Sequence, residues 1–146
     1  MPTANVLGLV LKNNHILLEK FNGAHSLGEG VYYRPIGGKI EHGESSQATL
    51  IREFKEEVDI EIIIDTYISC VENIFNIGNE IGHEITQVYV VKFKDENLYD
   101  KPWFEVIEGE RVSIAEWIPL KELEKVYMYP IKLKEIIFHN PFLAEG

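Results

Sequence analysis

The feature that most constrains the fold is one helical pattern set among strand patterns. The helix begins at Ser45 or Ser46, either of which suits an N-cap, and continues to about Val58. Its apolar residues recur at helical spacing, and the stripe expected to be buried comprises Ala48, Ile51, Phe54 and Val58. A last amphipathic helix is predicted over 131–139. Strands around a central helix predict an α/β (α+β) sandwich.

Strand patterns account for much of the remaining sequence. Segment 4–12 is apolar and β-branched enough for a buried strand, and segment 15–20 is its predicted hairpin partner across Asn13-Asn14. Further strands are predicted at 31–34, 60–69, 84–94 and 111–117, and a short helix at 120–125. The turn-prone stretch 35–43 and three other segments are predicted to be loops: 21–30, 75–82 and 95–110.

Size and charge narrow the class of protein. A chain of 146 residues fits one domain, 1–146, and its net charge of −10 with only three arginines makes duplex nucleic acid a poor partner. A single cysteine, Cys70, excludes an internal disulfide and is expected to be a buried core thiol. We expect neither a signal peptide nor a membrane span, and therefore a soluble, cytoplasmic protein without a membrane partner.

Three glutamates share one sector of the central helix: Glu53, Glu56 and Glu57. They lie roughly opposite the apolar stripe, and Arg52 and Lys55 are expected to point to the flanks, so that no cation separates the carboxylates. Such a cluster suits a hard cation, Mg²⁺ or Mn²⁺. The alternative is an ordinary solvent-facing charged surface in a glutamate-rich chain.

The segment around this helix favours the metal site. It runs GKIEHGESSQATLIREFKEEVDI over 38–60 and resembles the signature box of the Nudix (MutT-like) hydrolases. With this composition, the fixed letters recur by chance in on the order of one such chain in ten thousand. Asp59 stands where the family usually has Gly, at a helix end whose left-handed backbone Asp tolerates. The segments 35–38 and 116–120 also look Nudix-like.

The resemblance implies a Nudix-type α/β/α sandwich with a mixed β-sheet, in which the box is a loop–helix–loop. It also implies a metal-dependent pyrophosphohydrolase that uses Mg²⁺ or Mn²⁺. The expected substrate is a small nucleoside diphosphate linked to another moiety, cleaved by water attack on phosphorus. A homodimer is compatible with such a fold by analogy. Which nucleotide derivative is cleaved stays open, because specificity is expected to lie in the predicted loops.

By resemblance, Glu53 and Glu57 are the principal metal ligands. Glu56 is a third ligand or a base acting through water, and the backbone carbonyl of Gly37 completes the site. Glu44 and Arg52 are expected to orient the carboxylates, the alternative for Arg52 being a surface salt bridge of little energetic value.

Outside the box, two polar residues are candidates for substrate binding. Arg34 suits a substrate phosphate or an exposed strand end, and Glu84 suits an outer metal ligand or base. Three aromatic residues are candidates for stacking on a base, although such residues are usually core: Tyr32, Phe75 and Trp103. The competing function is a non-catalytic Nudix-fold sensor that binds a nucleotide. The complete set of box carboxylates favours the enzyme.

Overall fold

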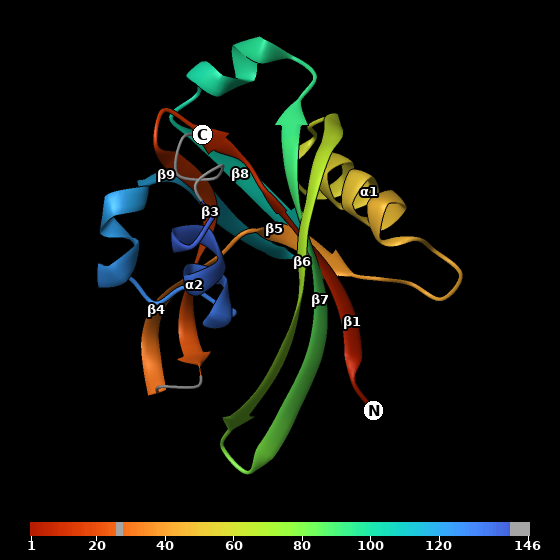
Figure 1. Ribbon diagram of the computed structural model, residues 1–146, viewed down its shortest axis with the longest axis vertical. Coiled ribbons are helices and arrows are strands. Elements are labelled where there is room, and N and C mark those ends of the chain that lie inside the picture. Colours follow the sequence, from red (N-terminus) through yellow and green to blue (C-terminus); the bar gives the residue numbers. More distant parts are fainter. Residues whose placement is uncertain (26–27, 141–146) are drawn as a thin grey trace.

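The computed structural model describes residues 1–25 and 28–140. These residues form nine strands. The helix α1 (Ser46–Val58) lies along one side of the strands (Figure 1). The strands are β1 (Thr3–Leu9), β2 (Leu11–Lys12), β3 (His15–His25), β4 (Gly28–Arg34), β5 (Ile36–Lys39), β6 (Ile62–Ile77), β7 (Glu80–Phe93), β8 (Trp103–Glu108) and β9 (Arg111–Pro119). The other helical segments are the 3-10 helices η1 (Glu96–Asp100) and η2 (Leu120–Lys125) and the helix α2 (Lys132–Phe138).

The strands form two sheets, one of which is mixed. Its order is β5-β1-β7-β6, with β1 parallel to β7 and the other pairs antiparallel. The second sheet has the order β2-β3-β9-β8, with β4 paired to β3. Helices α1 and α2 lie on opposite sides of the strands (Figure 1). The predicted fold class, an α/β arrangement with a mixed sheet between helices, is confirmed.

Two apolar clusters hold these layers together. One contains Leu50 and Phe54 of α1, and the other contains Leu133 and Ile137 of α2. Strand β1 contributes alternate residues to both, Val6 to the first cluster and Leu7 to the second. Because both of its faces are covered, β1 has the continuous apolar sequence that predicted a buried strand.

The predicted apolar stripe of α1 is partly wrong. Ile51 is 44% exposed and Ala48 is also exposed, whereas Leu50, Phe54 and Glu57 are buried. The strands β1, β5 and β8 cover α1 on the side that carries Glu57. The buried face is therefore rotated toward the carboxylates, so that Glu57 is buried and Glu53 partly buried while Glu56 faces solvent.

Both ends of α1 behave as predicted. The side chain of Ser45 is the N-cap and accepts a hydrogen bond from the backbone N–H of Ala48 at 3.1 Å. At the other end Asp59 has φ 55° and ψ 43°, a left-handed conformation, and its N–H bonds the carbonyl of Phe54. Asp therefore occupies the backbone conformation that makes Gly usual at this position.

Several segments that were predicted to be loops form strands or extend them. Residues 36–39 form β5, residues 103–108 form β8, and the segments around 21–30 and 75–82 extend the hairpins β3–β4 and β6–β7, with 26–27 outside the described residues. Segment 120–125 is a 3-10 helix.

Cys70 is exposed on β6 and is not the core thiol expected. In the described part of the chain, no helix is long and apolar enough to cross a membrane.

Candidate active site

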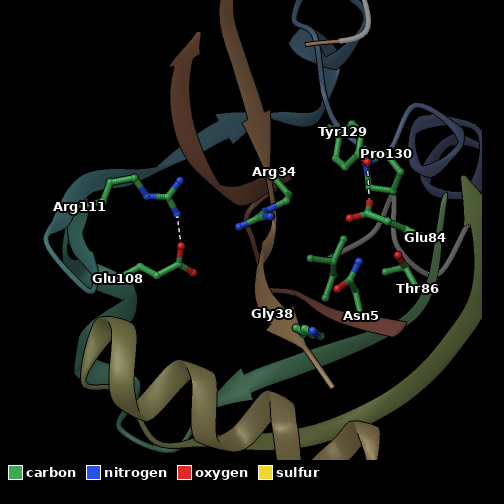
Figure 2. Close-up of a pocket in the computed structure, with 11 residues that line it drawn as sticks. Asn5, Arg34, Gly38, Glu84, Thr86, Glu108, Arg111, Tyr129 and Pro130 are labelled. Atoms are coloured by element: carbon green, nitrogen blue, oxygen red, sulfur yellow. Dashed lines mark hydrogen bonds and ion pairs between the residues drawn. The ribbon is translucent and has the colours of Figure 1, made fainter. Parts of the chain in front are cut away.

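A cleft of about 220 Å³ is bounded on one side by β1, β5 and β7 of the mixed sheet. Its lining comes from segments far apart in the chain: Asn5, Leu7, Arg34, Gly38, Lys39, Glu84, Thr86, Glu108, Arg111, Tyr129 and Pro130. Figure 2 shows Arg111 and Glu108 at one end, Glu84 and Tyr129 at the other, and Arg34 between them. Acidic and basic side chains therefore face the same space.

Glu53 lies beside this cleft, against a glycine of β5 that lines it. A Cβ on Gly38 would lie only 2.7 Å from the carboxyl carbon of Glu53. The side chain of Glu53 is 13% exposed, on the side of α1 that packs against β5. Gly38 thus leaves a space that the carboxylate fills, next to the cleft that Gly38 itself lines.

Glu57 lies one helical turn further along and is more deeply buried, at 6% exposure. Burial raises the pKa of its carboxyl group well above the ordinary value, and interactions with the carboxyl groups of Glu53 and Glu108 raise this pKa further. Three acidic groups are therefore adjacent, one of them from the β8–β9 hairpin. An acidic cluster with one buried member favours a bound cation, because a cation offsets both the desolvation of Glu57 and the mutual repulsion.

Arg52 lies among the box carboxylates and not on the flank. Its Nε and Nη2 each donate to a carboxylate oxygen of Glu44, both at 2.9 Å. Its Nη1 donates to Glu53 and to Glu56, each at 3.1 Å. The hydrogen bond from Arg52 and a second from Thr49 lower the pKa of Glu44 to about 2. The expectation that no cation separates these carboxylates is thus wrong, because one guanidinium links three of them.

The other two predicted ligands, Glu56 and Gly37, are not among the residues that line the cleft. The side chain of Glu56 is 59% exposed and contacts Arg52, away from the cleft lining. Gly37 is buried opposite Leu7 of β1, where a Cβ would lie 1.9 Å from the carbonyl oxygen of Val6. Over residues 1–25 and 28–140, no set of three or more His, Cys, Asp or Glu side chains is already arranged as a metal-binding group.

Glu84, from β7, lines the opposite end of the cleft. Its carboxylate accepts a hydrogen bond from the Tyr129 hydroxyl at 2.5 Å. Burial, and then this interaction, raise the pKa of Tyr129, so the phenol keeps its proton and remains a donor. Tyr129 therefore fixes the orientation of a carboxylate that faces the cleft. Nothing in the sequence pattern connected these residues, which are 45 positions apart.

A second cavity, of about 180 Å³, adjoins the cleft. Both are lined by Arg34, Arg111 and Tyr129, while Phe21, His25, Tyr32 and Phe75 line only the second. The rings of Phe21 and Tyr32 stack with centroids 5.1 Å apart. Of the three aromatic candidates, Tyr32 and Phe75 thus lie beside the site, whereas Trp103 is 51% exposed on β8 and lines neither cavity.

Sequence and structure comparisons place the chain among known proteins. A family model described as the NUDIX domain matches residues 1–139. A search of the curated proteins found no match.

Solved structures share the fold at low sequence identity. A MutT NUDIX hydrolase from Burkholderia pseudomallei has a TM-score of 0.70 and 23% identity, with 92% of this chain and 95% of that chain covered. The E. coli ORF135 protein has a TM-score of 0.66 and 22% identity, with 93% and 88% covered. A MutT protein from Bacillus halodurans has a TM-score of 0.63 and 19% identity, with 94% and 80% covered. The resemblance that the box suggested is confirmed across the domain.

Proposed function

Because this chain belongs to the Nudix hydrolase family, we propose that it hydrolyses the diphosphate bond of a small nucleotide-type substrate with the help of Mg²⁺ or Mn²⁺. The predicted enzyme class, a hydrolase acting on diphosphate bonds, is confirmed at the level of the family. The observation that carries the metal-dependent reaction is the group of adjacent carboxylates beside a cleft that also holds two arginines.

The donor set supports a hard cation. Glu53 and Glu57 provide carboxylate oxygens, the ligands that Mg²⁺ prefers. Burial raises the pKa of Glu57 and the nearby carboxyl group of Glu53 raises it further, and a bound cation would offset both effects. We propose Glu53 and Glu57 as the principal ligands, with the Gly37 carbonyl and Glu56 as further ones. When bound, the ion supplies positive charge beside the diphosphate and promotes ionisation of water.

The remaining box residues orient these ligands. Arg52 binds Glu44 through two nitrogens, so its guanidinium plane is fixed, and its third nitrogen contacts Glu53. Holding the carboxylate of Glu53 in one rotamer reduces the conformational entropy lost on ligand binding. Glu44 and Arg52 are thus proposed as positioning residues.

The cleft lining supports a diphosphate substrate. Guanidinium groups bind phosphate oxygens through paired hydrogen bonds, and Arg34 lies in the middle of the cleft (Figure 2). Glu84 faces the same space and is proposed as a base, or as an outer ligand, oriented by Tyr129. Water loses a proton and its oxygen bonds to one phosphorus of the diphosphate, while the arginine holds the phosphate in place. The bridging P–O bond breaks, and the bridging oxygen leaves with the other phosphate.

The adjoining cavity supports a nucleotide over a simple diphosphate. Its lining includes the stacked rings of Phe21 and Tyr32 together with Phe75, and aromatic faces bind flat bases by stacking. A nucleobase in this cavity and the phosphates in the adjoining cleft would match the order of these groups along a nucleoside diphosphate.

The experiment is a panel of nucleoside diphosphate derivatives incubated with Mg²⁺ or Mn²⁺, with products resolved by ion-exchange chromatography. We expect a nucleotide and a phosphorylated remainder from at least one member. Glu53→Gln is the inactive comparison and Glu61→Gln, an exposed carboxylate outside the cleft, the matched control. Nucleotide binding without turnover of any member would instead support the sensor function.

Four expectations from the sequence remain predictions. They are a single domain over 1–146, a cytoplasmic location, a homodimer, and the absence of duplex nucleic acid and membrane among the partners.

A further inference from the structure

A buried carboxylate lies where the apolar core meets the cleft. Glu19 of β3 is 1% exposed. It shares a strand face with Leu17 and Phe21, both buried apolar residues. An ionised carboxylate at such a position is costly unless charges and hydrogen bonds compensate for the lost water. The side chains around Glu19 must therefore supply these charges and hydrogen bonds.

Two arginines and a serine surround Glu19. Ser113 donates a hydrogen bond to one carboxylate oxygen at 2.5 Å. Arg34, its cross-strand partner, has Nη2 3.9 Å from the other oxygen, and Arg111 has Nη2 4.0 Å from the first. The pKa of Glu19 is raised, because burial raises it by more than the Ser113 hydrogen bond and the two arginines lower it.

Neither arginine forms a hydrogen bond with Glu19 at these distances. Within the described residues, Glu19 Oε1 and Arg34 Nε are buried without a hydrogen-bond partner. Arg111 donates to Glu108 at 2.6 Å, on the rim of the cleft. The carboxylate thus attracts both guanidinium groups without using up the donors of Arg34.

Phe21 limits where the two guanidinium groups lie. The Cζ atoms of Arg34 and Arg111 are 5.0 and 4.8 Å from the centre of its ring, at the distance of cation–π contacts. Both arginines line both cavities. With Glu108, which pairs with Arg111, the group has two cations and two carboxylates, so hydrogen-bond donors of the two guanidinium groups, and not net charge, suit an anion at the junction of the two cavities.

We propose that Glu19 is a positioning residue that holds Arg34 and Arg111 together as a clamp for one phosphate group of the substrate, between the diphosphate cleft and the aromatic cavity. The inference rests on the proposed function, since it assumes a phosphorylated ligand. Arg111 binds the phosphate directly with Arg34, and Glu19 acts through both by offsetting their mutual repulsion.

The test is calorimetric titration of ADP and, separately, of adenosine into the full chain with excess chelator, so that metal plays no part. We expect Glu19→Gln and Arg111→Gln each to weaken ADP binding by about tenfold, the scale of one charge-assisted hydrogen bond. Adenosine affinity stays unchanged. The control Glu61→Gln, which removes an exposed charge outside the cleft, leaves both affinities unchanged.

The double variant separates positioning from general support of the fold. If Glu19 acts through Arg111, adding Glu19→Gln to Arg111→Gln costs much less than tenfold. Unchanged ADP affinity in Glu19→Gln, or an equal loss for adenosine, would overturn the proposal. If Glu19→Gln does not fold, Ser113→Ala replaces it, with about a threefold loss for ADP expected and no loss contradicting the clamp.

The two proposals fail differently. A wild-type protein that binds ADP through the clamp but hydrolyses no diphosphate with Mg²⁺ would contradict only the proposed function. An active enzyme whose Glu19→Gln variant binds ADP normally would contradict only the clamp.

Discussion

Two groups of side chains, one beside the cleft and one lining it, differ in charge and origin; we call them the acidic wall and the basic wall. The acidic wall comes from one continuous segment, in which Glu53 lies against Gly38 and Glu57 is buried one helical turn further along α1. The basic wall is also aromatic, and Arg34 and Arg111 come from separate strands 77 positions apart. The residues proposed to bind the metal are thus concentrated in one segment, whereas those proposed to bind the substrate are distributed over the fold.

Metal removal gives the largest expected effect and acts on the acidic wall alone. Excess chelator should abolish turnover, and Mg²⁺ or Mn²⁺ should restore it, because the carboxylates cannot act on the diphosphate without a cation. Nucleotide binding to the arginine wall should persist in chelator. Full turnover by the metal-stripped protein would contradict the division between the walls.

A change in the basic wall should have a smaller effect and a different signature. Arg34→Ala should lower kcat/KM by a factor that corresponds to about 1–3 kcal/mol of lost transition-state stabilisation, chiefly through a higher KM. The stabilisation of the protein by Mg²⁺ should stay unchanged. Lys20→Ala is the matched control, since Lys20 is an exposed cation on the neighbouring strand β3. If the variant has wild-type kinetics on every accepted substrate, Arg34 does not bind the substrate phosphate and is an ordinary residue at the end of a strand.

The smallest effect concerns Glu44, at the edge of the acidic wall. Because Arg52 and Thr49 lower its pKa from 4.5 to about 2, its contribution to stability is full above about pH 5 and is lost as the pH falls toward 2. Urea midpoints of wild type and Glu44→Gln should therefore differ at neutral pH and converge in acid. A difference that does not change with pH would show that the Arg52–Glu44 contact is energetically unimportant. Glu122→Gln, an exposed change on η2, controls for the loss of one charge.

The acidic wall could be predicted because its information is local. Helical spacing, the cap at Ser45 and the left-handed end at Asp59 depend on neighbouring residues, and all three are present in the structure. The direction of burial was not predictable in this way. Which side of α1 is covered depends on strands β5 and β8, and both were assigned to loops.

The basic wall could not be predicted because strand pairing creates it. Glu19 lies opposite Arg34 through the β3–β4 register, and Ser113 reaches it from β9. Periodicity within β3 gives no sign that a glutamate at a core-facing position has two arginines beside it. Arg34 was a candidate only through its place before Pro35, and Arg111 and Glu108 were not candidates for the site.

The most direct test of a metal site on α1 is a pair of melting curves for Glu53→Gln, with and without Mg²⁺, beside a turnover assay. Gln keeps the size and helix propensity of Glu and removes one charge from the cluster. Without metal, we predict that the variant has a free energy of unfolding equal to that of wild type or higher by about a few tenths of a kcal/mol. The increase in Tm on adding Mg²⁺ should shrink and turnover should fall by orders of magnitude. Near-wild-type turnover and an undiminished Mg²⁺ effect in the folded variant would contradict the assignment of Glu53 as a metal ligand.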